Sequence, residues 1–351
     1  MITRQAPSNI ALVKYWGKRG RQLPRNPNAS FTLGVARTIT RLEWGERSAL
    51  DSAPVQVRLY YDGAEHEGFA ARVRAFLTSA AGEHPVLGRH AFAVHTRNTF
   101  PHGAGIASSA SAMAALAECV VALEEEGAGM TFAPDERLRR VSRLARLGSG
   151  SAARSVIGTA AAWGASRELP GSSDDYAVSL ADRLAPVFAD YRDSIVLVSA
   201  GEKPVSSSAG HALMEHHPYA EQRYGVARRR FATLLDVLRR GELDDFCALV
   251  EADALDLHGL MMQSTPPYVL LAPATLAVAE ATRRFRRESG VPVCFTLDAG
   301  PNVHLLYPAS ATAAVDAWLR DEVAALLPGG TLAGRVIDDH VGAGPGAAVL
   351  S

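Results

Sequence analysis

Four short stretches of the chain hold charged, glycine and serine residues that could bind anions or move a proton. The first, NIALVKYWGKR at residues 9–19, places Lys14 and Lys18 on either side of two aromatic residues and a glycine. Two ammonium groups near the end of a strand could bind a polyanion. On an exposed strand the same residues would need no functional explanation.

The second stretch, PHGAGIASSASAMAALA at residues 101–117, begins with glycines and continues into an Ala-rich helical pattern. Glycines let the backbone approach a phosphate closely, and the first turn of a helix carries unpaired N–H groups. The pattern is neither GxxxxGKS nor GxGxxG, so the usual P-loop and dinucleotide-binding interpretations do not apply. The alternative is a small-residue helix start that packs tightly on a sheet.

The third stretch, RLGSGSAARSV at residues 146–156, crowds glycines and serines ahead of Arg154. A helix that starts here would turn N–H groups and a partial positive charge outward, which predicts an anion site. Ser151 and Arg154 are three residues apart and would share one face of such a helix. A flexible loop followed by an N-cap serine is the alternative interpretation.

The fourth stretch, TLDAGPNVH at residues 296–304, places Asp298 at the end of an apolar run. A carboxylate at that point could orient and deprotonate a hydroxyl group. Aspartate ahead of Gly and Pro is also a common turn residue, so this stretch alone leaves both interpretations open.

The composition limits the classes of protein and of partner. A length of 351 residues predicts two domains, and 36 Lys plus Arg against 37 Asp plus Glu give no overall field that would attract nucleic acid or an anionic membrane. The three cysteines are far apart and form no CxxC pair, which supports neither a disulfide framework nor a zinc site. Because no signal peptide or long apolar run is visible, we expect a cytoplasmic protein.

The elements that must position these residues follow an α+β pattern. In the first half we expect strands over 30–44, 55–63 and 90–98, and helices over 68–81 and after residue 107. In the second half we expect helices over 224–241, 243–262 and 273–290 and strands over 193–200, 291–300 and 302–308. A polar connection before residue 190 predicts domains at 1–190 and 191–351, and we expect the Gly-rich tail at 329–350 to end in loosely held structure.

Together the four stretches resemble the diphosphomevalonate decarboxylases of the GHMP kinase superfamily in order and approximate spacing, from about Asn9 to Tyr307. The resemblance implies an α+β GHMP kinase fold with an N-terminal domain of the ribosomal protein S5 domain 2 type and a ferredoxin-like C-terminal domain. It implies that ATP and 5-diphosphomevalonate give isopentenyl diphosphate, ADP, phosphate and carbon dioxide, in the mevalonate route to isoprenoids. It further implies Mg²⁺ with the ATP and a homodimer, with no nucleic-acid or membrane partner.

The resemblance also assigns roles to residues. Asp298 matches the family's catalytic aspartate, Arg154 the arginine that holds the substrate carboxylate, and Lys14 a lysine near the reacting oxygen. The expected substrate-binding residues are Tyr15, Trp16, Gly17, Lys18, Ser149, Gly150, Ser151, Ala152, Ala153, Ser207 and Ser208. The residues expected to bind the ATP phosphates are Gly103, Ala104, Gly105, Ala107, Ser108 and Ser109. No protein metal ligand is expected, because adjacent His216 and His217 point apart on a regular element.

Two segments depart from the family pattern. The loop LPRNPNAS has Pro27 and Asn28 where the family has two serines, and PHGAGI stands where PTAAGL is common. Both changes keep the length and the small size of the segment. We therefore expect altered loop detail and retained chemistry.

Three alternatives share most of these motifs. A mevalonate 3-kinase stops after phosphorylation, but such relatives replace the residues that match Lys14 and Asp298, and both are present here. A non-catalytic nucleotide-binding relative that regulates a partner would typically lose its base, and Asp298 argues against it.

The third alternative is a 5-phosphomevalonate decarboxylase. Family members that bind the diphosphate commonly have an extra cation near the segment DGAEHEGFAARVRAF, and neither Arg72 nor Arg74 matches that position with certainty. Glu65 and Glu67 would repel a diphosphate. The remaining donors favour the 5-diphosphate as the substrate.

Overall fold

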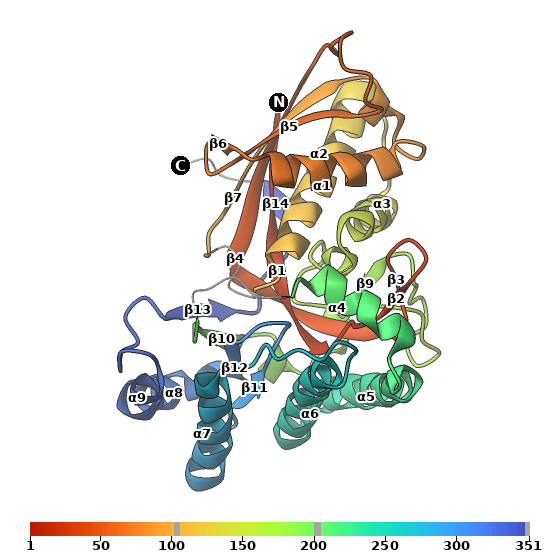
Figure 1. Ribbon diagram of the computed structural model, residues 1–351. Coiled ribbons are helices and arrows are strands. Elements are labelled where there is room, and N and C mark those ends of the chain that lie inside the picture. Colours follow the sequence, from red (N-terminus) through yellow and green to blue (C-terminus); the bar gives the residue numbers. More distant parts are fainter. Residues whose placement is uncertain (102–105, 200–204, 348–351) are drawn as a thin grey trace.

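The structure, a computed structural model, describes residues 1–101, 106–199 and 205–347. An eight-stranded sheet occupies the upper part of Figure 1 and a four-stranded sheet the lower part. The large sheet consists of β1 (Ile2–Val13), β4 (Asn28–Gly45), β5 (Gln56–Tyr61), β6 (Ala64–Glu65), β7 (Ala91–Asn98), β8 (Ala160–Trp163), β9 (Ala177–Ser179) and β14 (Gly346–Ala347). The small sheet has the order β11 (Cys294–Thr296), β12 (Val303–Pro308), β10 (Tyr191–Val196), β13 (Val336–His340).

A short hairpin and the helices complete the described elements. The hairpin pairs β2 (Lys18–Arg19) with β3 (Leu23–Pro24). The helices are α1 (Glu67–Ala80), α2 (Ser108–Ala128), α3 (Pro134–Gly148), α4 (Ser207–Leu213), α5 (Ala220–Arg240), α6 (Leu243–Met262), α7 (Pro273–Ser289), α8 (Thr312–Trp318) and α9 (Ala324–Leu326). The mixed α+β fold predicted from the sequence is confirmed by this arrangement. The predicted domain boundary at residue 190 falls directly before β10 and stays a prediction.

The long antiparallel pair of β1 and β4 carries the start of the first predicted site stretch, residues 9–19. Its register runs from Ile2 opposite Leu42 to Val13 opposite Ala29 and shifts between Pro7 and Asn9 and again between Ala11 and Val13. Such irregularities bend a strand and re-aim its side chains. The second shift lies directly before Lys14, where β1 ends.

Helices α1, α2 and α3 pack against the large sheet through one apolar cluster. Helix α2 brings many alanines to this contact, and small side chains allow close approach to the strands. Helix α3 begins with Pro134 and was not predicted from the sequence, although its apolar residues recur at helical spacing. It ends at Gly148, so the Gly/Ser stretch follows a helix rather than starting one.

The two sheets share a continuous core. Phe31 of β4 lies 5.8 Å from Tyr191 of β10 and 5.9 Å from Phe246 of α6, measured between ring centres. Phe188 completes this aromatic cluster, which is almost wholly buried. Because aromatic rings pack with defined geometry, the cluster fixes the second sheet and α6 relative to β1 and β4.

The Gly-rich tail pairs with both sheets as far as residue 347, and the loosely held end expected from the sequence falls on residues after 347, outside the described residues. Strand β13 pairs with β10, and β14 returns to the large sheet to pair with β1. The carboxylate of Asp339 accepts hydrogen bonds from the backbone N–H groups of Gly34, Val35 and Ala36 at 2.7–2.8 Å. The tail therefore ties the small sheet to the middle of β4, a long-range contact that local composition does not reveal.

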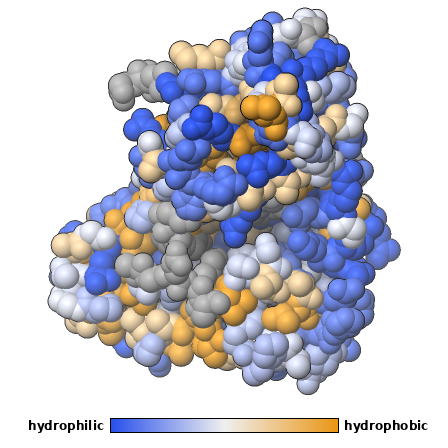
Figure 2. All heavy atoms as spheres, turned by 45° about the horizontal axis from the view of Figure 1, so that its top comes forward, coloured by the Kyte–Doolittle hydropathy of each residue, from blue (hydrophilic) through white to orange (hydrophobic). Residues whose placement is uncertain are grey.

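The face shown in Figure 2 has hydrophobic residues in several separate areas among hydrophilic ones. Within the described ranges, no helix combines the length and the apolar character needed to cross a membrane.

We expect Asp339→Ala to lower the free energy of unfolding by about 2–4 kcal/mol, because three backbone N–H groups lose a charged acceptor. Denaturant unfolding of the variant and of Asp338→Ala measures this. Asp338 is exposed and accepts one bond, from Ser194 at 3.2 Å, so its replacement should cost less than about 1 kcal/mol. Equal losses for the two variants would contradict the proposed tie.

Candidate active site

An ion pair joins the end of β1 to the segment that follows β11. Lys14 Nζ lies 2.8 Å from Asp298 Oδ1 and also donates to the carbonyl of Ala11 at 2.8 Å. The Lys14 side chain is 2% exposed, whereas that of Asp298 is 23% exposed and lines a polar pocket. The third N–H of the ammonium has no partner among the described residues, so it is available to a ligand.

The surroundings keep Asp298 ionised. Burial alone would raise the pKa of this carboxyl, but Lys14, His304 and Arg154 outweigh it and hold the pKa below its usual value. A carboxylate that is ionised at neutral pH and open on one side can accept a proton from a substrate hydroxyl. The turn interpretation is also correct in part, since the Gly300 N–H donates to the Asp298 carbonyl at 2.7 Å.

Arg154 lies in the same pocket as a buried and firmly held cation. Its Nε donates to Ser30 Oγ at 2.9 Å, one Nη donates to Asn9 Oδ1 at 3.0 Å, and the other donates to Asn28 Oδ1. Burial lowers the pKa of this guanidinium to about 10, which still leaves it charged at neutral pH. Each Nη keeps one further N–H, the pair that a carboxylate binds in a bidentate manner.

The loop that departs from the family pattern takes part in holding Arg154. Asn28, which stands in place of a serine, supplies an acceptor to the guanidinium, and Ser30 supplies another. The loop thus keeps acceptors for the guanidinium, and the expectation of retained chemistry stays a prediction.

The Gly/Ser stretch is correctly located next to the pocket, but its predicted local structure is wrong. Residues Gly150–Ala153 form a single 3-10 turn, and Arg154 follows it. A Cβ on Gly150 would lie 2.7 Å from the Tyr15 ring, and one on Gly148 would lie 2.8 Å from Met113 Sδ. The glycines therefore make room for neighbouring side chains, and no α-helix starts here.

An adjoining part of the pocket, which we call the outer end, has a different charge. Its described cations are Lys18 and Arg72, and Ser149, Ser151, Ser207 and Ser208 also line it. The centre of the His211 ring lies 4.4 Å from that of Tyr15 and 4.6 Å from that of Trp16. Its Nδ1 accepts a hydrogen bond from the Gly17 N–H at 3.0 Å. Burial, assisted by Lys18, lowers the pKa of His211 to about 3, so the ring is neutral at physiological pH.

The two arginines of α1 differ in their surroundings. Arg72 lines the polar pocket at both ends, whereas Arg74 donates to Glu67 and to the Val57 carbonyl. Glu65 pairs with Arg58 at 3.1 Å. Neither Glu65 nor Glu67 is among the residues that line the polar pocket or its outer end.

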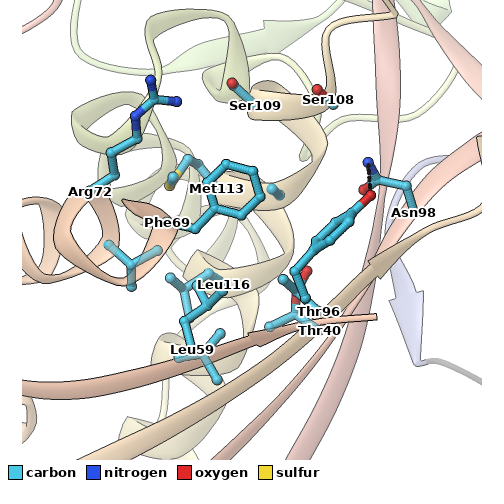
Figure 3. Close-up of a pocket in the computed structure, with 14 residues that line it drawn as sticks. Thr40, Leu59, Phe69, Arg72, Thr96, Asn98, Ser108, Ser109, Met113 and Leu116 are labelled. Atoms are coloured by element: carbon cyan, nitrogen blue, oxygen red, sulfur yellow. Dashed lines mark hydrogen bonds between the residues drawn. The ribbon is translucent and has the colours of Figure 1, made fainter. Parts of the chain in front are cut away.

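A second, mainly apolar pocket opens beside the start of α2. Figure 3 shows Ser108 and Ser109 at one end of it, with Arg72 of α1 on the same side, while Leu59 and Leu116 lie deeper. Polar atoms of Thr40, Thr96 and Asn98 also line this pocket. Apolar walls with a few polar groups suit a flat heterocyclic ring.

The structure brings together most of the predicted site residues. The polar pocket and its outer end are lined by Lys14, Tyr15, Trp16, Lys18, Ala107, Ser108, Ser109, Ser149, Gly150, Ser151, Arg154, Ser207, Ser208 and Asp298. Ala152 and Ala153 do not line it, because they are fully buried in the core. Gly17 contributes its N–H to His211, and Gly103, Ala104 and Gly105 lie outside the described residues.

Sequence reasoning missed several residues that hold the site together. Asn9 opens the first quoted stretch but carried no predicted role, and His211 had no local signal. Arg72 was considered for the extra cation, but the sequence did not distinguish it from Arg74. Among the described residues, no group of three His, Cys, Asp or Glu side chains could hold a metal ion. His217 and His258 each bond a backbone carbonyl instead, at 3.0 Å.

The chain is similar to known proteins along most of its length. Residues 6–177 match the diphosphomevalonate decarboxylase-like N-terminal domain, and residues 194–326 match the mevalonate 5-diphosphate decarboxylase C-terminal domain. The diphosphomevalonate decarboxylase mvd1 of Aspergillus fumigatus is 31% identical over 87% of this chain and 76% of its own length. The diphosphomevalonate decarboxylase of Bos taurus is 30% identical over 86% of this chain and 75% of its own length.

Solved structures agree. Mevalonate diphosphate decarboxylase from Staphylococcus aureus superimposes with a TM-score of 0.81 at 26% identity, over 99% of this chain and 97% of its own. A structure described as MDDEF in complex with MVAPP, AMPPCP and magnesium gives a TM-score of 0.80 at 27% identity, over 98% and 97%. With these likenesses over both halves, the chain is an enzyme of the diphosphomevalonate decarboxylase family.

Proposed function

We propose that this enzyme converts ATP and 5-diphosphomevalonate into isopentenyl diphosphate, ADP, phosphate and carbon dioxide. The observation that carries the proposal is that Asp298, Lys14 and Arg154 line one pocket, with an open carboxylate and two buried cations. The relatives' names and the complex of MDDEF with MVAPP and AMPPCP support it.

The chemistry explains why these three groups are needed together. A tertiary alcohol is a poor leaving group, and a β-hydroxy acid has no electron sink for decarboxylation. Transfer of the ATP γ-phosphoryl group to the 3-hydroxyl makes a leaving group. The C–O bond then breaks with its electron pair on phosphate, the electrons of the C1–C2 bond form the new double bond, and C1 departs as carbon dioxide.

Each residue has a role in this sequence. Asp298 accepts the proton of the 3-hydroxyl as its oxygen attacks the γ-phosphorus. Lys14 keeps Asp298 ionised and offers its third N–H to the phosphoryl oxygens. Arg154 binds the C1 carboxylate through its two remaining N–H groups, which fixes C1 for departure.

ATP would lie across the polar pocket and the apolar pocket, both of which Ser108 and Ser109 line. The first turn of α2, with Ser108 and Ser109, offers hydroxyl and backbone donors to the phosphates, and the apolar pocket of Figure 3 would take the adenine ring. Mg²⁺ would be bound by phosphate oxygens and serine hydroxyls, because the described residues offer no carboxylate cluster. The ion would neutralise charge on the transferring phosphoryl group.

The outer end would hold the 5-diphosphate. Lys18 and Arg72 supply charge, and His211, Ser207 and Ser208 add neutral polar groups. Arg72 is thus a candidate for the extra cation that the sequence left open. A homodimer also stays a proposal, which sedimentation would test.

The substrate assignment predicts that kcat/KM for 5-diphosphomevalonate exceeds that for 5-phosphomevalonate by about tenfold or more, because two cations face the outer end. Carbon dioxide trapped from carboxyl-labelled substrate, measured beside ADP, gives both rates. A tenfold preference for the monophosphate would overturn the assignment and leave the decarboxylation chemistry standing. A 3-phosphate that accumulates without gas release would instead favour a 3-kinase.

We expect Asp298→Asn to lower kcat by about 10²–10⁴-fold or more, since the amide keeps the shape but cannot accept the proton. ATP affinity should change little. Asp321→Asn, at an exposed position, is the matched control and should behave as the parent. A kcat of the Asp298→Asn enzyme within about tenfold of the parent value would show that Asp298 serves only to form the turn.

A further inference from the structure

Helix α6 contacts both members of the Lys14–Asp298 pair through their backbones. Asp253 Oδ2 accepts the backbone N–H of Lys14 at 2.7 Å. Five residues further along the helix, His258 Nε2 lies 3.0 Å from the backbone carbonyl oxygen of Asp298. A carbonyl only accepts, so His258 Nε2 carries the hydrogen and donates it.

Both contacts are buried and well supported. Asp253 is 0% exposed and His258 is 1% exposed. Arg223 of α5 binds the Asp253 carboxylate in a bidentate manner at 2.7 and 2.9 Å, and Arg230 adds a third bond at 3.1 Å. The carboxylate that holds Lys14 is therefore itself fixed by two cations.

The geometry of α6 makes it a spacer between the two segments. An α-helix rises about 1.5 Å per residue, so positions 253 and 258 lie about 7.5 Å apart along the axis. Between them Leu257 lines the polar pocket. The β1 end and the segment after β11 belong to different sheets, and α6 bonds both directly.

We propose that α6 sets the distance between Lys14 and Asp298, with Asp253 and His258 acting as positioning residues through the backbone of those two groups. This rests on the proposed role of Asp298 as the proton acceptor. Neither residue is among those that line the pocket, so neither is given a role in touching substrate.

The proposal has a consequence for the pH dependence of the reaction. Loosening either contact lets Lys14 and Asp298 move apart, so the pKa of Asp298 rises toward and beyond its usual value. Ionised Asp298 is then lost at a higher pH, and the acid limb of kcat/KM moves upward. The charged or titratable groups that face Asp298 are Lys14 after β1, Arg154 after the 3-10 turn, His304 on β12 with its partner Asp193 on β10, and His258 on α6.

The test compares His258→Leu with His258→Gln. Leucine removes the donor, whereas the glutamine amide offers an N–H close to the position of the histidine Nε2. We expect His258→Leu to lower kcat by about 10- to 100-fold and to move the acid limb upward by about half a pH unit or more, with ATP affinity unchanged. His258→Gln should recover most of both effects.

His217→Leu is the matched control, because His217 is also buried and also contacts a backbone carbonyl, that of Leu260, at 3.0 Å through Nε2. It should lower the thermal midpoint without moving the acid limb. Carbon-13 NMR titration of the Asp298 carboxyl, with its signal assigned by comparison with Asp298→Asn, measures the pKa of Asp298 without turnover. It can therefore be applied even if the His258→Leu enzyme is too slow to assay.

Three outcomes would overturn the proposal. These are an Asp298 pKa in His258→Leu equal to that of the parent, a His258→Gln variant as impaired as His258→Leu, and a His217→Leu variant with the same displaced acid limb. Failure of the proposed function is distinguishable, since it would appear as an active Asp298→Asn enzyme whatever the His258 variants do.

Discussion

The site depends on one constraint: the charges of Lys14 and Asp298 must meet between two sheets, partly out of water. Each charge alone would pay a large desolvation cost, and their contact at 2.8 Å offsets it while leaving one face of the carboxylate open. Arg154 adds a second buried cation close enough to lower the pKa of Asp298 further. The same electrostatic arrangement keeps Asp298, the proposed proton acceptor, ionised and makes the pocket attractive to anions.

Much of the fold serves to hold that arrangement. The aromatic cluster around Phe31, and the Asp339 carboxylate of β13 bound to backbone N–H groups of β4, join the first sheet to the second. The register shift in β1 lies directly before Lys14. Arg154 is held by three side-chain acceptors from β1 and β4. The cations are thereby fixed before substrate arrives, which is how preorganised charge stabilises a transition state at little reorganisation cost.

Local patterns in the sequence predicted the α+β class, most strands and long helices, and the stretches that form the pocket. They failed where contacts between residues distant in the sequence decide the local structure. Gly148 and Gly150 suggested a helix start, yet they make room for Met113 and Tyr15, which lie far away in the sequence. The composition of the tail gave no sign that Asp339 holds it to β4, because this contact joins residues about 300 positions apart along the chain, a separation that no window of neighbouring residues can detect. Arg72 and His211 likewise become candidate site residues only because the fold brings both to the same pocket.

The most direct test of this account is a double-mutant cycle on Lys14→Met and Asp298→Asn, with single-turnover rates of carbon dioxide release. If the two groups act as one unit, the double variant should lose far less rate than the product of the two single losses, because only the contact of Lys14 with the phosphoryl oxygens is left to remove once Asp298 is replaced. Denaturant unfolding of all four proteins checks that each is folded. Rate losses that simply multiply would mean that the two groups act independently, and would contradict the central claim.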